Sequence, residues 1–188
     1  MPSGREWVAA LYGAWRLMRF DPRGMRWFDL SVGGFWRSFW AALPVAPGYA
    51  VIVALEVSGR AQPVDPGWAI LVGGLGYALG WVALPLAAIP LTRLLRLTPG
   101  YVPLVVATNW ASVLQALVVV PLAVLDATGM LPADAGGFLR LIADLYILVY
   151  LWFVVRTALQ TNAGTAIGFV IVNEILGVFI HVGTVRLL

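Results

Sequence analysis

The sequence predicts an all-α integral membrane protein, a five-span transmembrane helix bundle with an N-terminal interfacial amphipathic helix. Hydrophobic residues make up 61% of the 188 residues and charged residues only 11%, and the mean hydropathy is +0.90. Soluble domains carry about 25% charged residues, so the composition excludes an ordinary soluble domain. Two further observations support the prediction: five apolar stretches are long enough to span a membrane, and the arginines lie mainly on one side of them.

The five stretches divide the chain into a short interfacial segment, residues 1–32, and a membrane domain, residues 33–188. A helix that crosses the hydrocarbon core needs about 20 apolar residues. Segments rich in Gly, Pro, Asp and Asn separate the stretches, and these residues favour turns and helix ends. The predicted spans are residues 34–57, 67–91, 101–125, 136–156 and 163–186.

The distribution of arginine predicts the orientation of the bundle. All twelve basic residues are arginines, and nine of them lie before or at the start of the first span, or in the loops after the second and fourth spans. Cytoplasmic segments carry the excess of basic residues, so we expect a cytoplasmic N-terminus and a periplasmic C-terminus. The arginine-, alanine- and glycine-rich composition suggests a bacterium, which places the chain in the inner membrane.

The pattern of residues 7–20 predicts a helix ahead of the first span, because apolar residues recur at helical spacing and arginine lies on the opposite face. One interpretation is a helix in the headgroup plane, where the N-terminal arginines meet anionic lipid headgroups. The other is a helix packed on the protein's own cytoplasmic loops. The residues that define the pattern are Trp7, Leu11, Trp15 and Met18 on one face, with Arg16 and Arg19 as the basic residues.

Several polar residues fall inside the predicted spans, where a charge at the bilayer centre costs about 2.5–3.5 kcal/mol on insertion scales. We therefore expect them to face the bundle interior. Arg140 and Asp144 are four residues apart, which predicts a local ion pair. The full set is Asn109, Gln115, Arg140, Asp144, Asn173, Glu174 and His181.

Glu174 is the most informative of these residues because it lies near the middle of the last span. Gln115 and Asn109 lie at comparable depth in the third span, so we expect one of them to hydrogen-bond Glu174. Glu174 and His181 are seven residues apart and share a helix face. Two roles remain open for this pair, a structural hydrogen bond between helices or a path for protons or substrate.

The sequence contains none of the short motifs that mark common catalytic sites. It has no cysteine and one histidine, and it has no HExxH, GxSxG or Walker sequence. We therefore predict that the protein is not an enzyme and needs no cofactor or metal. The net charge of +3 is too small to predict binding of nucleic acid.

Two short segments resemble the Yip family of five-span, Rab-GTPase-interacting membrane proteins and its bacterial relatives. The first is FDLSVGGFW at residues 28–36, and the second is TPGYVPLV at residues 98–105. Gly34 stands where the family has proline, and the second proline follows its tyrosine more closely than in the family. The resemblance implies an organiser or adaptor, without a Rab partner in a bacterium. The matching positions are Asp29, Leu30, Gly33, Gly100, Tyr101 and Pro103.

Two functions follow from these observations. The first is a non-enzymatic organiser, adaptor or accessory subunit that acts through lipid contacts and through a protein partner or a second copy of the chain. The alternative is a small transporter or channel, or a subunit of one, that uses the intramembrane carboxylate of Glu174.

Overall fold

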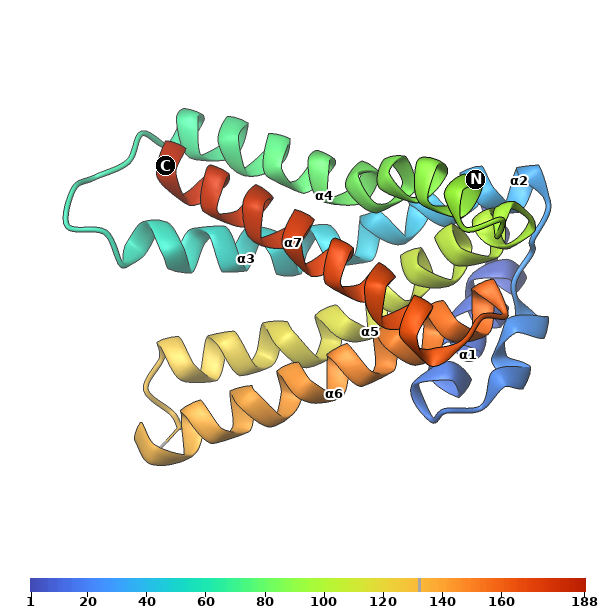
Figure 1. Cartoon of the computed structure of the whole chain (residues 1–188). Coiled ribbons are helices and arrows are strands. Elements are labelled where there is room, and N and C mark those ends of the chain that lie inside the picture. The colour runs from blue at the N-terminus through green and yellow to red at the C-terminus, as the bar shows by residue number, and fades with distance from the viewer. Residues whose placement is uncertain (132) are drawn as a thin grey trace.

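A computed structural model of the chain describes residues 1–131 and 133–188, and in these ranges it contains helices and no strands (Figure 1). The α-helices are α1 (Gly4–Met18), α2 (Val32–Ser38), α3 (Ala42–Ser58), α4 (Pro66–Leu94), α5 (Tyr101–Ala127), α6 (Ala133–Leu159) and α7 (Ala163–Leu187). Three short 3-10 helices join them: η1 (Pro22–Trp27), η2 (Phe39–Ala41) and η3 (Thr98–Gly100).

Five helical stretches in the described residues are long and apolar enough to cross a membrane, which confirms the predicted multi-pass bundle. They extend the predicted spans by at most three residues at either end, and the fourth and fifth begin at the predicted residues. The first is built from α2, η2 and α3 in succession. The stretches are Val32–Ser58, Pro66–Leu94, Thr98–Ala127, Gly136–Leu159 and Ala163–Leu187.

Polar side chains fix the starts of several helices by accepting hydrogen bonds from the first turn, where backbone N–H groups lack helical partners. Asp65 accepts from the backbone N–H of Trp68 at 2.8 Å, and Asn162 accepts from that of Thr165 at 2.9 Å. Ser3 begins α1 with a reciprocal pair of hydrogen bonds to Glu6. These caps explain why the helices begin directly after polar loops.

The spans pack around a common interior. α3 packs on α4 and α5, α4 packs on α7, and α7 packs on α6, which closes the ring by packing on α5. In Figure 1 the two termini lie at opposite ends of the bundle. We call the end that carries α1 and η1 the cap end, and the end that carries residues 59–65, residues 128–131 and Leu188 the open end.

The hydrophobic core lies at the cap end. The buried residues of α5 all fall between Leu104 and Val113, and the buried hydrophobic side chains in the described part of α6 fall between Tyr150 and Leu159. α3, which runs toward the open end, has no buried residue. Core packing therefore joins α1 to the cap-end halves of the spans.

The N-terminal helix is present, and it packs on the 3-10 helix η1 that follows it and on the spans α5 and α6. Its most buried residues are Ala14 and Leu17, both 0% exposed. The ring of Trp7 lies edge-on to that of Trp110 at 4.9 Å between centroids. Of the predicted apolar face, Trp7, Leu11 and Met18 pack against the core, whereas Trp15 is 43% exposed.

Two tyrosines of α6 hold the end of α1 in place. The hydroxyl of Tyr150 donates to the backbone oxygen of Ala14 at 3.0 Å, and that of Tyr146 donates to the backbone oxygen of Met18 at 2.7 Å. Carbonyl groups at the end of a helix lack partners within it. The two hydrogen bonds therefore fasten α1 to the bundle by its C-terminal turn.

Candidate functional site

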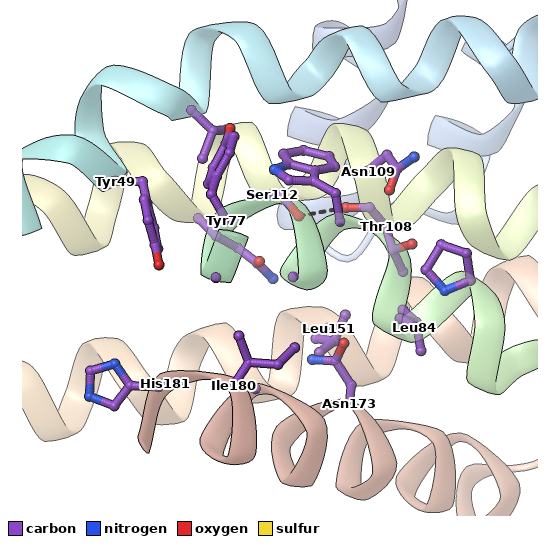
Figure 2. Close-up of a pocket in the computed structure, with 17 residues that line it drawn as sticks. Tyr49, Tyr77, Leu84, Thr108, Asn109, Ser112, Leu151, Asn173, Ile180 and His181 are labelled. Atoms are coloured by element: carbon purple, nitrogen blue, oxygen red, sulfur yellow. Dashed lines mark hydrogen bonds between the residues drawn. The ribbon is translucent and has the colours of Figure 1, made fainter. Parts of the chain in front are cut away.

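The polar residues of the spans gather around two neighbouring cavities inside the ring. The central cavity has a volume of about 310 Å³ and is lined by residues of α3, α4, α5, α6 and α7 (Figure 2). The second cavity, of about 370 Å³, lies toward the open end and is lined by α3, α5, α6, α7 and Leu131. His181 lines both cavities, so the two adjoin at this residue.

The central cavity is lined by amides, hydroxyls and aromatic rings. Two of its hydroxyl groups are engaged within α5: Ser112 donates to the backbone oxygen of Thr108 at 3.0 Å, and Thr108 donates to that of Leu104 at 2.8 Å. The polar and aromatic lining residues are Tyr49, Tyr77, Trp81, Thr108, Asn109, Ser112, Gln115, Asn173 and His181.

The two amides that were predicted to hydrogen-bond Glu174, those of Asn109 and Gln115, do not do so. The side-chain nitrogen of Asn109 donates to the hydroxyl of Ser38 at 2.9 Å, and both residues are buried. The Gln115 nitrogen is buried and has no hydrogen-bond partner among the described residues. Gln115 therefore has unused hydrogen-bonding capacity beside the cavity, which is uncommon for a buried polar group.

The predicted partners of Glu174 are wrong, because this residue lies on the exposed side of α7. Its carboxylate accepts one hydrogen bond, from the side-chain nitrogen of Asn173 at 3.2 Å. Asn173, Gly177 and Ile180 form the inward face of α7 at the central cavity. Successive helical residues turn by about 100°, so placing Asn173 inward moves Glu174 to the flank. Of Glu174 and His181, His181 alone reaches the described cavities.

The open-end cavity is lined by charged residues from three spans. The His181 Nε2 atom lies 3.6 Å from Oε1 of Glu56, and Nη1 of Arg140 lies 4.0 Å from Oδ2 of Asp126. Asp144 also lines this cavity. Three carboxylates and one guanidinium therefore line this cavity, which gives it a formal excess of negative charge.

The predicted ion pair between Arg140 and Asp144 is wrong. Arg140 lies nearest to Asp126 on the neighbouring α5, and the two side chains are 69% and 56% exposed. A long arginine side chain near a membrane surface extends toward the aqueous side, where Asp126 ends the third span. Asp144 is about one helical turn deeper and lines the cavity instead.

Sequence reasoning missed Glu56 as a site residue. The signal that could have identified it is a carboxylate inside a predicted span, because Glu56 lies near the end of the first span. Its side chain is 26% exposed in the fold. The partner that reveals it, His181, is on α7, and no local spacing relates the two residues.

A second group of charges holds the cap end together. Nε of Arg37 lies 2.7 Å from Oε1 of Glu6, and the same guanidinium binds Asp29. Asp29 also accepts a hydrogen bond from the backbone N–H of Ser31 at 2.9 Å. That bond, with Arg37 adding its charge, lowers the pKa of Asp29. For Glu6 the backbone hydrogen bond from Ser3 and the charge of Arg37 lower the pKa.

The arginines of α1 and η1 form part of an exposed surface with aromatic residues. Asp21 forms an ion pair with Arg16 and lies 3.0 Å from Nε of Arg23. Hydrogen bonds from these two arginines lower the pKa of Asp21. The guanidinium of Arg19 lies over the ring of Trp15, 4.9 Å from its centroid. Arg16 is therefore paired inside the protein, whereas Arg19 lies along the outer face.

The first family-like segment forms the start of the first span at the cap end. A Cβ added at Gly34 would lie 2.0 Å from the backbone oxygen of Asp29, so the turn requires glycine there. Leu30 and Gly33 are exposed.

The second segment meets the first through aromatic contact. The rings of Phe35 and Tyr101 lie 5.9 Å apart, and the hydroxyl of Tyr101 donates to the backbone oxygen of Pro85 at 3.3 Å. A Cβ at Gly100 would lie 2.9 Å from Leu159. Pro103 is half-buried in the first turn of α5. These positions bring α2, α4, α5 and α6 together.

The five apolar helices define a multi-pass membrane protein. No family model matches the chain, and no curated protein or solved structure matches it. Among the described residues, no group of three or more His, Asp or Glu side chains is placed to hold a metal ion. The Yip resemblance stays a prediction from its two segments.

Proposed function

We propose that the chain is a non-enzymatic protein of the bacterial inner membrane that acts as an organiser, adaptor or accessory subunit. It does so by binding another transmembrane helix through α7 and lipid headgroups through α1 and η1. The observation that carries this proposal is the exposed position of Glu174 in the middle of α7.

Glu174 lies in an exposed apolar stripe on α7. Ile171 is 52% exposed, Val178 is 60% exposed and Ile167 is 50% exposed, and these residues follow the helical spacing that includes Glu174. We call these four residues the α7 stripe. Gly164 and Gly168 are four residues apart in α7, a spacing that permits close helix contact. A Cβ added at Gly168 would meet nothing within 4 Å, so this position leaves room for a helix from outside.

The free energy of the protein in the membrane is lower when another helix covers the α7 stripe. Glu174 is the twelfth residue of α7, so it lies about 16 Å from the helix start at a rise of 1.5 Å per residue. A charge at the bilayer centre costs about 2.5–3.5 kcal/mol on insertion scales. Polar side chains in membrane helices hydrogen-bond across helix contacts. A partner helix with a donor or acceptor opposite Glu174 removes much of the cost.

The outer face of α1 and η1 supports the lipid contact. Tyr12, Trp15 and Trp27 are 40%, 43% and 44% exposed, and arginines lie beside them. Aromatic rings concentrate at headgroup level, and arginines attract anionic lipids there. The arginine excess at the same end favours a cytoplasmic N-terminus. The two termini lie at opposite ends of the bundle (Figure 1), which supports a periplasmic C-terminus as the other half of this proposal.

The alternative function, transport through Glu174, has less support. Both described cavities lie inside the ring, and Glu174 is not among the residues that line them. A path that used this carboxylate would have to run along the outside of α7.

Site-specific crosslinking in native membranes tests the proposed partner. The chain has no cysteine, so Ile171→Cys and Val178→Cys each carry one thiol for a photoactivated crosslinker. Leu79→Cys, on the exposed face of α4 where Leu79 is 53% exposed, is the matched control. We expect a discrete adduct from the two α7 stripe variants. Adducts of equal yield from all three positions would contradict the proposal.

Substitution of Glu174 tests its part in that contact. Glu174→Gln keeps hydrogen-bonding capacity, so we expect the adduct to persist. Glu174→Leu removes that capacity, so the adduct should weaken. An adduct with twice the mass of the chain identifies a second copy as the partner, and another mass identifies a different membrane protein.

A further inference from the structure

We propose that the interior of the bundle binds a small protonated amine, which enters past the carboxylates of the open end and is held in the central cavity beside Gln115. This inference is independent of the α7 stripe, because the residues involved face the inside of the ring. It assigns a ligand-binding activity in addition to the proposed adaptor function.

The two cavities provide a route from the open end to the centre. The outer cavity is lined by Asp126 and Leu131, which lie where α5 ends. His181 lines this cavity and the central one. The lining of the route is therefore continuous from the end of α5 to the middle of the bundle.

The charges along the route favour a cation over an anion. Arg140 is matched by Asp126 at 4.0 Å. Apart from this pair, the cavity is lined by two more carboxylates, those of Glu56 and Asp144, and His181 lies 3.6 Å from Glu56. A cleft lined by one sign of charge raises the local concentration of the opposite ion. The outer cavity therefore attracts cations even when the imidazole is protonated.

The central cavity is lined by aromatic rings, which can bind such a cation. The rings of Tyr49 and Tyr77 lie 4.9 Å apart, and those of Tyr77 and Trp81 lie 6.1 Å apart. All three residues line the central cavity. An ammonium group is attracted to the face of an aromatic ring, most strongly that of Trp, in a desolvated site.

Gln115 supplies a free hydrogen-bonding group at the same place. Its buried nitrogen has no partner in the described chain. The oxygen of the same amide is not buried in this way, so it can accept a hydrogen bond from an ammonium group in the cavity. Asn173 presents a second amide from α7, across the space shown in Figure 2.

The volume of the central cavity suits a small ligand. A cavity of about 310 Å³ is at the low end of the range for small-molecule sites, roughly 300–1,000 Å³. Methylammonium is a suitable probe because it combines a compact charge with N–H donors. Acetate has a similar size and the opposite charge, and it serves as the control ligand.

Calorimetric titration of the full chain in nanodiscs tests the inference. We expect saturable binding of methylammonium and no saturable binding of acetate. Gln115→Leu removes the acceptor and should weaken methylammonium binding about tenfold or more, the effect of losing one hydrogen bond to a charged group. Glu56→Gln should weaken it several-fold, with the loss reduced at high salt.

The matched control is Asp65→Asn, which removes a carboxylate at the same end of the bundle. Asp65 caps α4, and asparagine caps helices equally well, so methylammonium binding should be unchanged. Glu56→Gln keeps the shape of a partly exposed side chain, and it therefore tests the inference even if Gln115→Leu fails to fold. No saturable methylammonium binding, saturable acetate binding, or equal losses from Glu56→Gln and Asp65→Asn would overturn the inference.

Discussion

The cap end and the open end are built from the same helices, but side chains fill the interior of the first, whereas interior cavities extend from the centre into the second. In α5, Leu104 and Val105 are 0% exposed, whereas no residue after Val113 in that helix is buried. In α6, Val154 and Val155 are buried, whereas Arg140 and Asp144 line the outer cavity. Each helix therefore changes from core to cavity wall along its length.

The difference follows from α1, which adds a layer at one end only. The small buried residues Ala10 and Ala14 let it approach the spans closely, and at Gly13 the 3-10 helix η1 packs on it in turn. The open end has no described element of this kind. Dense packing contributes stability, so we infer that the cap end holds the fold and leaves the open end free to bind ligands.

The largest expected effect is loss of a core side chain at the cap end. Leu17 is 0% exposed, and Leu17→Ala should lower the free energy of unfolding by about 2–5 kcal/mol because it removes contacts and leaves a cavity. Ile52 lines the outer cavity, so Ile52→Ala should have a clearly smaller effect. Unfolding by SDS in mixed micelles measures both. Equal losses would contradict the difference between the two ends.

The next effect concerns the turn before the first span. Gly34→Ala places a methyl group 2.0 Å from the backbone oxygen of Asp29, and we expect a loss of about 1–3 kcal/mol. Gly33→Ala is the adjacent control, because its methyl would meet side chains rather than backbone, Nη1 of Arg37 at 3.0 Å and Oγ of Ser31 at 3.5 Å. The same unfolding assay compares them, and a loss from Gly33→Ala as large as that from Gly34→Ala would rule out this steric explanation.

A smaller effect is expected from the hydrogen bonds that fasten α1. Tyr150→Phe deletes the bond to the Ala14 carbonyl and should lower the free energy of unfolding by about 0.5–1.5 kcal/mol. Tyr146 is 39% exposed, so Tyr146→Phe should lower it less, because water replaces the lost bond. Limited proteolysis of the N-terminal segment reports release of α1. Faster cleavage in Tyr146→Phe than in Tyr150→Phe would reverse this ranking and contradict it.

The smallest expected effect is a loss of stability at low pH. The pKa values of Glu6 and Asp29 are lowered from ordinary values of 4.5 and 3.8. Their charged forms therefore stabilise the fold above those values, and the contribution is lost as the pH falls through the lowered pKa values. The two side chains are 36% and 40% exposed, so the change is small and screened by salt. Proteolysis of α1 should accelerate below about pH 4, and no change down to pH 2 would contradict this prediction.

Sequence patterns predicted the spans because apolar length alone identifies a membrane helix. They also predicted the depth of Glu174, but not its direction around the helix. That direction depends on which neighbours pack against α7, and Asn173 and Gly177 face the interior there. The partner of Arg140 was missed for a related reason, since Asp126 lies on another helix.

The hydrophobic pattern also did not identify which residues of α1 are the most buried. The aromatic residues suggested the packed face, yet Ala14 and Leu17 are the most buried and Trp15 is exposed. Small residues give little signal in a hydrophobic pattern, although they allow the closest helix contacts. The outer cavity was predicted only in part: Asp144, Arg140 and His181 were identified as polar candidates, whereas Glu56 was recognised only from the fold.

Thiol accessibility at two adjacent residues tests most directly whether a polar interior opens toward the open end. Ala111 is 0% exposed, and Ser112 lines the central cavity. The natural chain has no cysteine, so Ala111→Cys and Ser112→Cys each present a single thiol. A small cationic methanethiosulfonate reagent, applied at the C-terminal side of sealed vesicles, should modify Ser112→Cys and leave Ala111→Cys unmodified. Equal reaction rates at the two positions, or no reaction at either, would contradict an accessible interior.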